Sequence, residues 1–256
     1  MNAVIRANRL HEQLAAHLAR EIIAGRLRPG MPIPSEPELV AEFGVSKTVA
    51  RETVQALASV GLVRVQHGKR TVVLTDDEWQ LLSQLVQQAY REEGQDGGLI
   101  DELYEVRLLL EPPAARWAAE RATKELVNEI VAIVNEMEAA IPVQNGRFLD
   151  LDREFHLAIV GPASANRVLR AIVRDIHELL VTSWARSHLA EKEVVEAFRQ
   201  HRRVASAIAS GDGAGAEEAM RAHLEWAART DREPDDRGRR ESGVPRSRRS
   251  GLSGAG

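Results

Sequence analysis

The side chains of this sequence best suited to holding a metal ion are one carboxylate and three imidazoles: Asp152, His156, His201 and His223. Asp152 and His156 stand four residues apart in LDLDREFHLAIV, so a helix would place them on one face. The other two histidines belong to later segments with helical patterning that can pack against this face. Such ligands suit a divalent transition metal better than calcium or magnesium, with zinc preferred and nickel, manganese or iron as alternatives.

Helical patterning dominates the chain from Thr75 onward. The predicted helices, about seven, cover 77–91, 99–121, 124–140, 147–160, 165–187, 193–210 and 213–229. A loop is expected at 92–98, and Pro112-Pro113 should kink or restart the second of these helices. An all-α bundle is a natural scaffold for ligands converging from facing helices. Beyond Asp231 the sequence has almost no apolar residue, which predicts a disordered tail.

The first 75 residues have a different organisation. A helical stripe of apolar residues ends near Gly25, and two shorter helices are predicted after it, on either side of Gly44. Ser35 with Glu38 forms a capping box for the first of these, and Ser46 can cap the second. The alternating segment LVRVQHGKRTVVL then predicts a strand, a turn and a strand. Together these elements predict a winged helix-turn-helix.

A helix-turn-helix places the start of its second helix in the major groove of DNA. The expected contacts from that helix are Ser46, Lys47, Thr48 and Arg51. Arg51 can fork onto a guanine, whereas the lysine and the hydroxyls suit phosphates. The wing tip offers a second set of expected contacts: His67, Gly68, Lys69 and Arg70.

Charge is distributed unevenly along the chain. Residues 1–75 hold ten Lys/Arg against six Asp/Glu, and residues 76–230 hold seventeen against twenty-seven. A basic N-terminal module followed by an acidic one fits a protein in which only the N-terminal module contacts phosphates. The absence of cysteine excludes disulfides and thiolate metal sites. With neither a membrane-spanning apolar run nor a signal-peptide pattern, we expect a cytoplasmic protein with no membrane partner.

Residues 25–74, GRLRPGMPIPSEPELVAEFGVSKTVARETVQALASVGLVRVQHGKRTVVL, resemble the DNA-binding segment of the GntR family of bacterial regulators. The family pattern runs G-x-L-x-P-G-x-x-L-P-S-E, then G-V-S-R-x-T-V-R-E-A-L, then G-x-G-T-x-V. Two positions depart from it. Pro37 stands where many members have an arginine that contacts DNA, and Arg70 replaces the second glycine of the wing.

The later helices resemble the FadR-type C-terminal domain of the same family. The segments that carry the resemblance are LIDELYEVRLLLEPPAARWAAERAT (99–123), DREFH, and the spaced His201, Gly211-Asp212, Met220 and His223. In that family the matching Asp and His residues hold a metal, and relatives respond to sugar acids, lactate or pyruvate. The resemblance makes Arg107 the candidate clamp for an effector carboxylate, with an ion pair to Glu111 or Glu105 as the alternative. Asn166 either binds the effector or caps a helix, and Trp184 either lines the pocket or fills the core.

We therefore predict a mainly α protein with a DNA-binding domain at 1–75, a metal- and effector-binding and dimerisation domain at 76–230, and a tail at 231–256. The predicted function is a homodimeric transcription regulator, a repressor rather than an enzyme, that binds a palindromic operator. A small carboxylate effector, such as a sugar acid, hydroxy acid or oxo acid, would bind at the metal and control the activity of the regulator. The alternatives are a metal-dependent hydrolase or isomerase with an accessory DNA module, and a regulator with a purely structural metal.

Overall fold

The computed structural model describes residues 2–66, 68–141, 146–164, 166–184 and 191–242. The chain divides into two units: Met1–Glu105 with Ala171–Ser183, and Val106–Arg170 with Trp184–Gly256. Helices α5 (Asp96–Arg121) and α8 (Arg167–Trp184) contribute residues to both units. None of the helices in the described ranges has the length and hydropathy needed to cross a bilayer.

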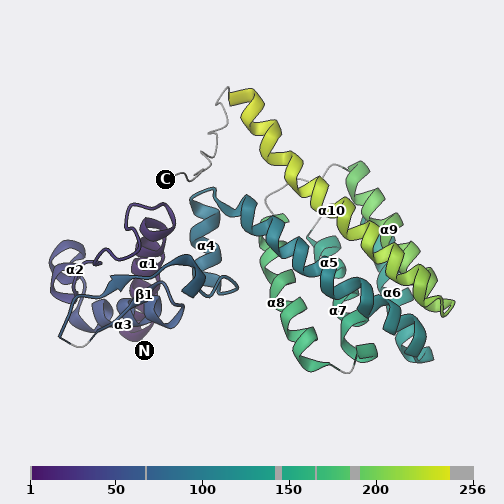
Figure 1. Cartoon of the computed structure of the whole chain (residues 1–256), viewed down its shortest axis with the longest axis horizontal. Helices are drawn as coiled ribbons and strands as arrows, with labels where there is room; N and C mark the ends of the chain where they lie inside the picture. Colours follow the sequence, from purple (N-terminus) through teal and green to yellow (C-terminus); the bar gives the residue numbers. More distant parts are fainter. Residues whose placement is uncertain (1, 67, 142–145, 165, 185–190, 243–256) are drawn as a thin grey trace, which may run out of the picture. The chain divides into compact units, whose positions relative to one another are not determined.

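The part of the first unit that precedes α5 contains a winged helix-turn-helix, as predicted. Its elements are α1 (Asn2–Ile23), α2 (Glu36–Phe43), α3 (Lys47–Ser59), β1 (Val63–Arg64), β2 (Val72–Val73), the short 3-10 helix η1 (Asp76–Glu78) and α4 (Gln84–Glu92) (Figure 1). The two strands are antiparallel, with Val63 opposite Val73. Apolar side chains of α1, α3 and both strands, among them Leu18 and Leu57, pack into one core.

Capping residues close to α2 and α3 define where these helices begin and end. The Ser35 hydroxyl accepts a hydrogen bond from the Glu38 amide, and the Glu38 carboxylate accepts one from the Ser35 amide. Gly44 ends α2 in the left-handed conformation, with φ of 65°. The Ser46 hydroxyl then accepts the Val49 amide at 3.2 Å and starts α3. The tight turn between the two helices is therefore encoded locally.

A side chain at Gly61 would collide with the backbone of the first unit. Gly61 follows α3 with φ of 74°, and a Cβ added there would lie 2.1 Å from the Glu78 carbonyl oxygen. Gly61→Ala should therefore lower the free energy of unfolding by about 2–4 kcal/mol, because strain and a backbone collision add. Gly44→Ala is the matched control, with φ of 65° and no atom within 4 Å of the added Cβ. It should cost only about 1 kcal/mol in urea unfolding of the full chain. Equal losses in the two variants would contradict the collision.

The start of α4 differs from the sequence prediction of a helix over 77–91. Asp76–Glu78 form a 3-10 turn, and α4 begins only at Gln84, where the Ser83 hydroxyl accepts the Val86 amide. The Gln87 side chain donates to the Leu81 carbonyl and holds the intervening turn in place. Val86 and Ala89 are buried in the same core as α1, so α4 is an integral part of the first unit.

The second unit is a helical bundle. Besides parts of α5 and α8, its helices are α6 (Lys124–Ala140), α7 (Arg147–Ser164), α9 (Glu191–Ala209) and α10 (Gly213–Ser242). With α4, seven helices follow the wing in the described residues, as predicted. Figure 1 shows α9 and α10 running side by side, and both contribute to the core around Met137, Phe155 and Leu224.

Two features of the long helices differ from the prediction. Of the predicted kink or restart at Pro112-Pro113, the restart does not occur: α5 is continuous there, and Ala114, Ala115 and Ala118 in the following turns are fully buried. α10 continues to Ser242, into the segment after Asp231 where a disordered tail was predicted. Extending an existing helix costs far less than nucleating one. Residues 243–256 of the predicted tail lie outside the described residues.

Candidate functional site

The exposed side of α3 and the wing carry the predicted DNA contacts. Ser46, Lys47, Thr48 and Arg51 are all exposed at the start of α3, while its opposite side is buried. On the wing, Gly68, Lys69 and Arg70 are exposed, and His67 lies outside the described residues. Helix and wing together present a surface of donors and positive charge with which DNA phosphates and base edges can pair.

Arg70 also has a partner within the protein. Its guanidinium lies 2.5 Å from the carboxylate of Glu38, the residue that completes the capping box of α2. Hydrogen bonds from Ser35 and Arg70 lower the pKa of Glu38 to about 2. The wing is thereby tied to the start of α2 by an ion pair.

The second unit brings together all four residues predicted to bind metal. Asp152 and His156 lie one turn apart on α7, His201 comes from α9, and His223 from α10. All four are buried, with exposures of 7% for Asp152, 0% for His156 and His201, and 2% for His223. One ligand atom from each lies within 4.8 Å of all the others. We call these four residues the metal cluster.

The spacing of the ligand atoms fits a transition metal. The Nε2 atom of His201 lies 3.0 Å from Oδ1 of Asp152, and the Nε2 atoms of His223 and His156 are 3.2 Å apart. His156 Nε2 is 4.0 Å from Asp152 Oδ1. A tetrahedral metal with bonds of about 2.0 Å separates its ligands by about 3.3 Å, so small side-chain movements complete such a site.

Hydrogen bonds on the outer nitrogens of two histidines leave lone pairs facing inward. The Nδ1 of His201 contacts the Ala197 carbonyl at 2.7 Å and must donate to it, because a carbonyl can only accept. Nε2 of a neutral His201 is then an acceptor that faces a carboxylate oxygen. Two acceptors at that distance repel unless a cation or a second proton lies between them. The chemistry of the donor set therefore fits a bound metal.

The second histidine is held in the same way by a residue that the sequence analysis did not place in the site. Glu111 on α5 is fully buried and accepts a hydrogen bond from Nδ1 of His156. This leaves Nε2 of His156 directed toward the cluster. Carboxylate–histidine pairs of this kind orient metal ligands and increase their basicity. In the sequence, the only signal for this role of Glu111 was its four-residue spacing from Arg107. That spacing is also typical of ordinary surface ion pairs.

Burial keeps two of the imidazoles neutral, as metal ligation requires. Desolvation lowers the pKa of His156, although the nearby Glu111 carboxylate opposes that shift. The pKa of His223 lies well below its usual value, because of its burial and the proximity of His201 and His156. Both rings therefore offer a lone pair rather than a positive charge at neutral pH.

Arg107, the predicted carboxylate clamp, lies beside the cluster and is only 1% exposed. Its Nε donates to Glu111 at 2.6 Å, which is the ion pair that the sequence offered as the alternative role. Its terminal NH2 group also lies 3.3 Å from Nε2 of His156. One side of the guanidinium therefore meets Glu111, and a terminal nitrogen reaches His156.

Asn166 and Trp184 are placed differently from the cluster residues. Asn166 is exposed at the start of α8, where its side-chain oxygen accepts the amides of Val168 and Leu169, each at 3.1 Å. This is the capping role that the sequence offered as its alternative. Trp184 is the last residue of α8, and its side chain lies outside the described residues.

The cap can be separated from an effector role by mutation. Asn166→Ala should lower the free energy of unfolding by about 1 kcal/mol, because two helix amides lose their acceptor. Zinc binding and acid binding, both measured by calorimetry, should not change. Asn166→Asp keeps a cap acceptor and should retain the stability. Loss of acid affinity in both variants would instead make Asn166 an effector contact.

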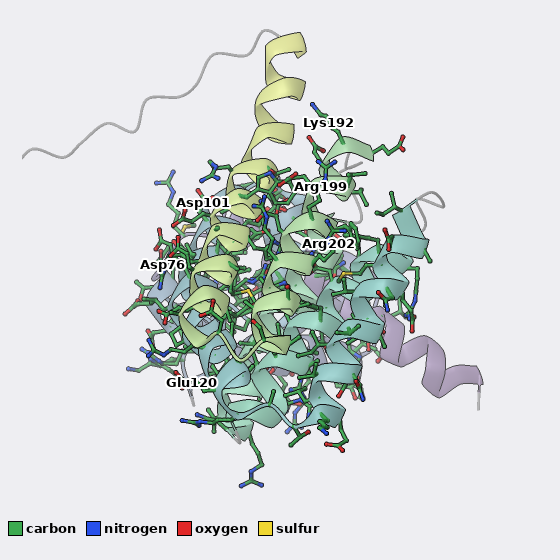
Figure 2. The ribbon with its side chains drawn as sticks, turned by 90° about the vertical axis from the view of Figure 1, so that its right-hand side faces the viewer. Asp76, Asp101, Glu120, Lys192, Arg199 and Arg202 are labelled. Atoms are coloured by element: carbon green, nitrogen blue, oxygen red, sulfur yellow. The ribbon has the colours of Figure 1, made fainter. Side chains whose placement is uncertain are left out.

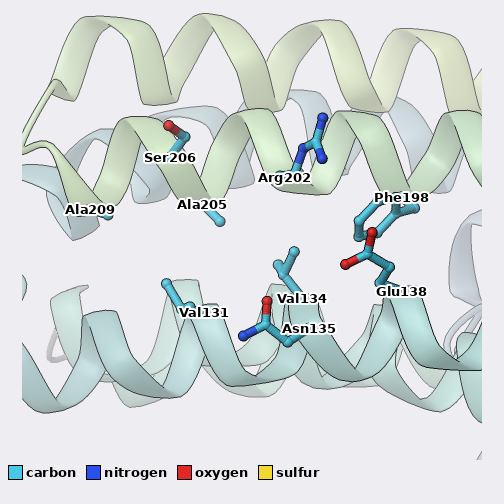
Figure 3. A pocket seen from close by; sticks show the side chains of 9 residues that line it. All are labelled: Val131, Val134, Asn135, Glu138, Phe198, Arg202, Ala205, Ser206 and Ala209. Atoms are coloured by element: carbon cyan, nitrogen blue, oxygen red, sulfur yellow. The ribbon is translucent and has the colours of Figure 1, made fainter.

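A groove between α6 and α9 is separate from the predicted site. It is lined by Val131, Val134, Asn135, Glu138, Phe198, Arg202, Ala205, Ser206 and Ala209 (Figure 3). Its floor is apolar, and no predicted site residue lines it.

A winged helix-turn-helix followed by a helical bundle defines a class of protein, the DNA-binding transcription regulators. Comparison with known proteins agrees. The model of bacterial regulatory proteins of the gntR family matches residues 10–73, and the FCD domain model matches residues 102–225. The chain belongs to the GntR family, with the FadR-type combination of domains.

Two curated relatives illustrate the similarity. The chain is 31% identical over 209 residues to the galactonate operon transcriptional repressor of Escherichia coli K12, covering 81% of this chain and 90% of that protein. It is 33% identical over 205 residues to the transcriptional regulator LutR of Bacillus subtilis, covering 78% and 91%. These relatives are DNA-binding regulators, which confirms that the chain is a regulator and not an enzyme and removes the hydrolase alternative.

Solved structures share the fold. The structure described as Lar, which controls the agr system of Listeria monocytogenes, has a TM-score of 0.60 and 16% identity, covering 87% of this chain and 96% of that one. McbR of Escherichia coli has a TM-score of 0.51 and 18% identity, covering 88% and 98%. At these identities the similarity establishes the fold alone.

Proposed function

We propose that this protein is a transcription repressor whose operator binding is controlled by a small organic acid bound at a metal in the second unit. The observation that carries the proposal is the metal cluster, in which Asp152 and three imidazoles converge within 4.8 Å. A divalent metal there, zinc in preference to nickel, manganese or iron, supplies a Lewis acid for a carboxylate. The galactonate repressor among the relatives is named for the operon of a sugar acid, and sugar acids, hydroxy acids and oxo acids form the class we propose.

A second cationic group besides the metal would strengthen binding of the acid, since a buried anion is very costly unless it is paired. We assign this role to Arg107, whose terminal nitrogen lies 3.3 Å from Nε2 of the ligand His156. A guanidinium also pairs with a carboxylate through two parallel hydrogen bonds. Trp184 is proposed to line the pocket, and the described contacts of Asn166 favour its role as a cap.

Control of DNA binding requires that the acid binds one arrangement of the protein better than another. An acid that prefers the arrangement unable to bind the operator relieves repression. The DNA contacts proposed are the exposed Ser46, Lys47, Thr48 and Arg51 of α3, with His67, Gly68, Lys69 and Arg70 of the wing. Since DNA is the target, we place the protein in the bacterial cytoplasm.

We propose a homodimer, in which two wings and two recognition helices bind a palindrome. Support comes from an exposed apolar stripe on α5, where Leu109 is 74% exposed and Val106 is 38% exposed. Glu102 and Arg116 each lie seven residues from Leu109 along that helix. Antiparallel pairing of two copies about Leu109 would therefore bring opposite charges together. Sedimentation should give twice the chain mass of 28.3 kDa.

Selection of binding sites from a random duplex library tests the proposal. We expect one two-fold symmetric sequence, bound by the zinc-loaded protein and released when the effector acid is added. Zinc-stripped protein should bind the same duplex but not respond to the acid. Selection of no sequence at all, or release by the acid without metal, would contradict the proposal.

A purely structural metal is the second candidate, and the burial of the cluster favours it. An enclosed set of four protein ligands is typical of structural zinc sites. In that case metal removal destabilises the second unit and no acid binds. Acid binding to the loaded protein distinguishes the two candidates.

A further inference from the structure

The buried charges of this protein are concentrated at one place. Among the residues that the structure describes, the buried Asp, Glu, Lys and Arg residues are Arg107, Glu111 and Asp152, with exposures of 1%, 0% and 7%. All three belong to the metal cluster or contact it. The other charged side chains that the structure describes reach solvent, as Lys192 and Arg199 do on the outside of α9 (Figure 2). The net charge of this one site therefore has to be balanced within the protein interior.

The contacts of Glu111 determine that balance. Its carboxylate accepts a hydrogen bond from Nε of Arg107 at 2.6 Å and another from Nδ1 of His156. Arg107 and Glu111 thus form a neutral pair, which costs far less to bury than either charge alone. Asp152 leaves one negative charge, because the imidazoles of the cluster are neutral when they bind a metal. A divalent metal in the cluster then gives a site with one net positive charge.

We propose that this charge balance, set by Glu111, makes the site select acids with one negative charge over acids with two. The inference rests on the proposed function and specifies its ligand class as a monocarboxylate. A monoanion brings the loaded site to neutrality. A dianion leaves one uncompensated negative charge close to Glu111 and Asp152, and such a buried charge is strongly unfavourable.

Matched pairs of acids that differ by one carboxylate test the rule. We would titrate the zinc-loaded protein at pH 7.5 with D-galactonate and galactarate, D-gluconate and glucarate, and L-lactate and L-malate, using calorimetry. The monoanion of at least one pair should bind, with an affinity at least about tenfold higher than that of its dianion. Equal or tighter binding of the dianions would overturn the charge rule but leave the proposed function intact. Binding of none of the acids to the zinc-loaded protein would overturn both.

Glu111→Gln tests the residue itself. Glutamine keeps an oxygen that can accept the His156 proton, but it raises the net charge of the loaded site to two positive charges. The preference should then shift toward the dianion by about tenfold or more. The matched control is Glu120→Gln on the same helix, where the side chain is 42% exposed, and it should leave the preference unchanged. An unchanged preference in a Glu111→Gln protein that still holds zinc would overturn the proposal.

A second variant keeps the test decisive if Glu111→Gln fails to hold zinc. Arg107→Gln removes a positive charge and leaves the loaded site neutral. Both members of a pair should then bind more weakly, and the dianion should lose more affinity than the monoanion. Equal losses for the two acids would contradict a role for net charge.

Discussion

Replacing Arg51 by alanine is expected to abolish recognition of the operator while leaving both units folded. Arg51 is exposed near the start of α3, and the opposite side of that helix buries Val54 and Leu57 in the core. A guanidinium forked onto a guanine contributes about 1–3 kcal/mol of discrimination, or about 5- to 150-fold in affinity per half-site. Two half-sites multiply the loss. Fluorescence anisotropy with the selected palindrome measures it.

The matched control for this variant is Arg199→Ala, which removes an exposed arginine from α9 in the second unit. It should bind the palindrome as the unchanged protein does, because Arg199 lies outside the DNA-binding fold. Thermal unfolding should be the same for both variants. A footprint retained by Arg51→Ala would show that α3 does not read the sequence through this residue.

His201→Ala is expected to remove the metal from the second unit. Loss of a residue that only supports a ligand typically costs 10- to 100-fold in metal affinity, and loss of a ligand should cost at least about 100-fold. Asp152 would also lose the neighbour that lies 3.0 Å from its Oδ1. Mass spectrometry of dialysed protein should find zinc well below one ion per chain, and competition with a chelator gives the affinity.

His11→Gln provides the control, since this histidine belongs to α1 in the first unit. Its zinc content should equal that of the unchanged protein. If His201→Ala also retained one zinc with unchanged affinity, the cluster would not be the metal site. The proposed control by an acid bound at this metal site would then be contradicted.

Local sequence signals were sufficient to predict the DNA-binding fold. Ser35, Gly44 and Ser46 cap helices through bonds to residues at most four positions away, so their roles follow from the sequence itself. Asp152 and His156 are likewise related by a single helical turn. Local patterns did not identify the other histidines that pack against this turn. The family resemblance identified them as His201 and His223.

Long-range packing explains what the sequence did not reveal. Glu111 acts on His156, which is 45 residues away in the chain, and only the packing of α5 against α7 brings them together. Its four-residue spacing from Arg107 indicated an ion pair but not a buried one. The helix boundaries that moved, at Gln84 and Ser242, depend on a side-chain cap and on helix propagation. Neither effect leaves an apolar periodicity in the sequence.

Thermal stability with and without metal tests the central claim most directly. The protein would be stripped with a chelator or loaded with zinc, and each form heated with sugar acids, 2-hydroxy acids and 2-oxo acids. A ligand that binds only the native state raises the melting temperature by mass action. We predict that at least one monocarboxylic acid stabilises the zinc-loaded protein and leaves the stripped protein unchanged. Stabilisation by zinc alone, with no response to any acid, would contradict control by an acid bound at the metal.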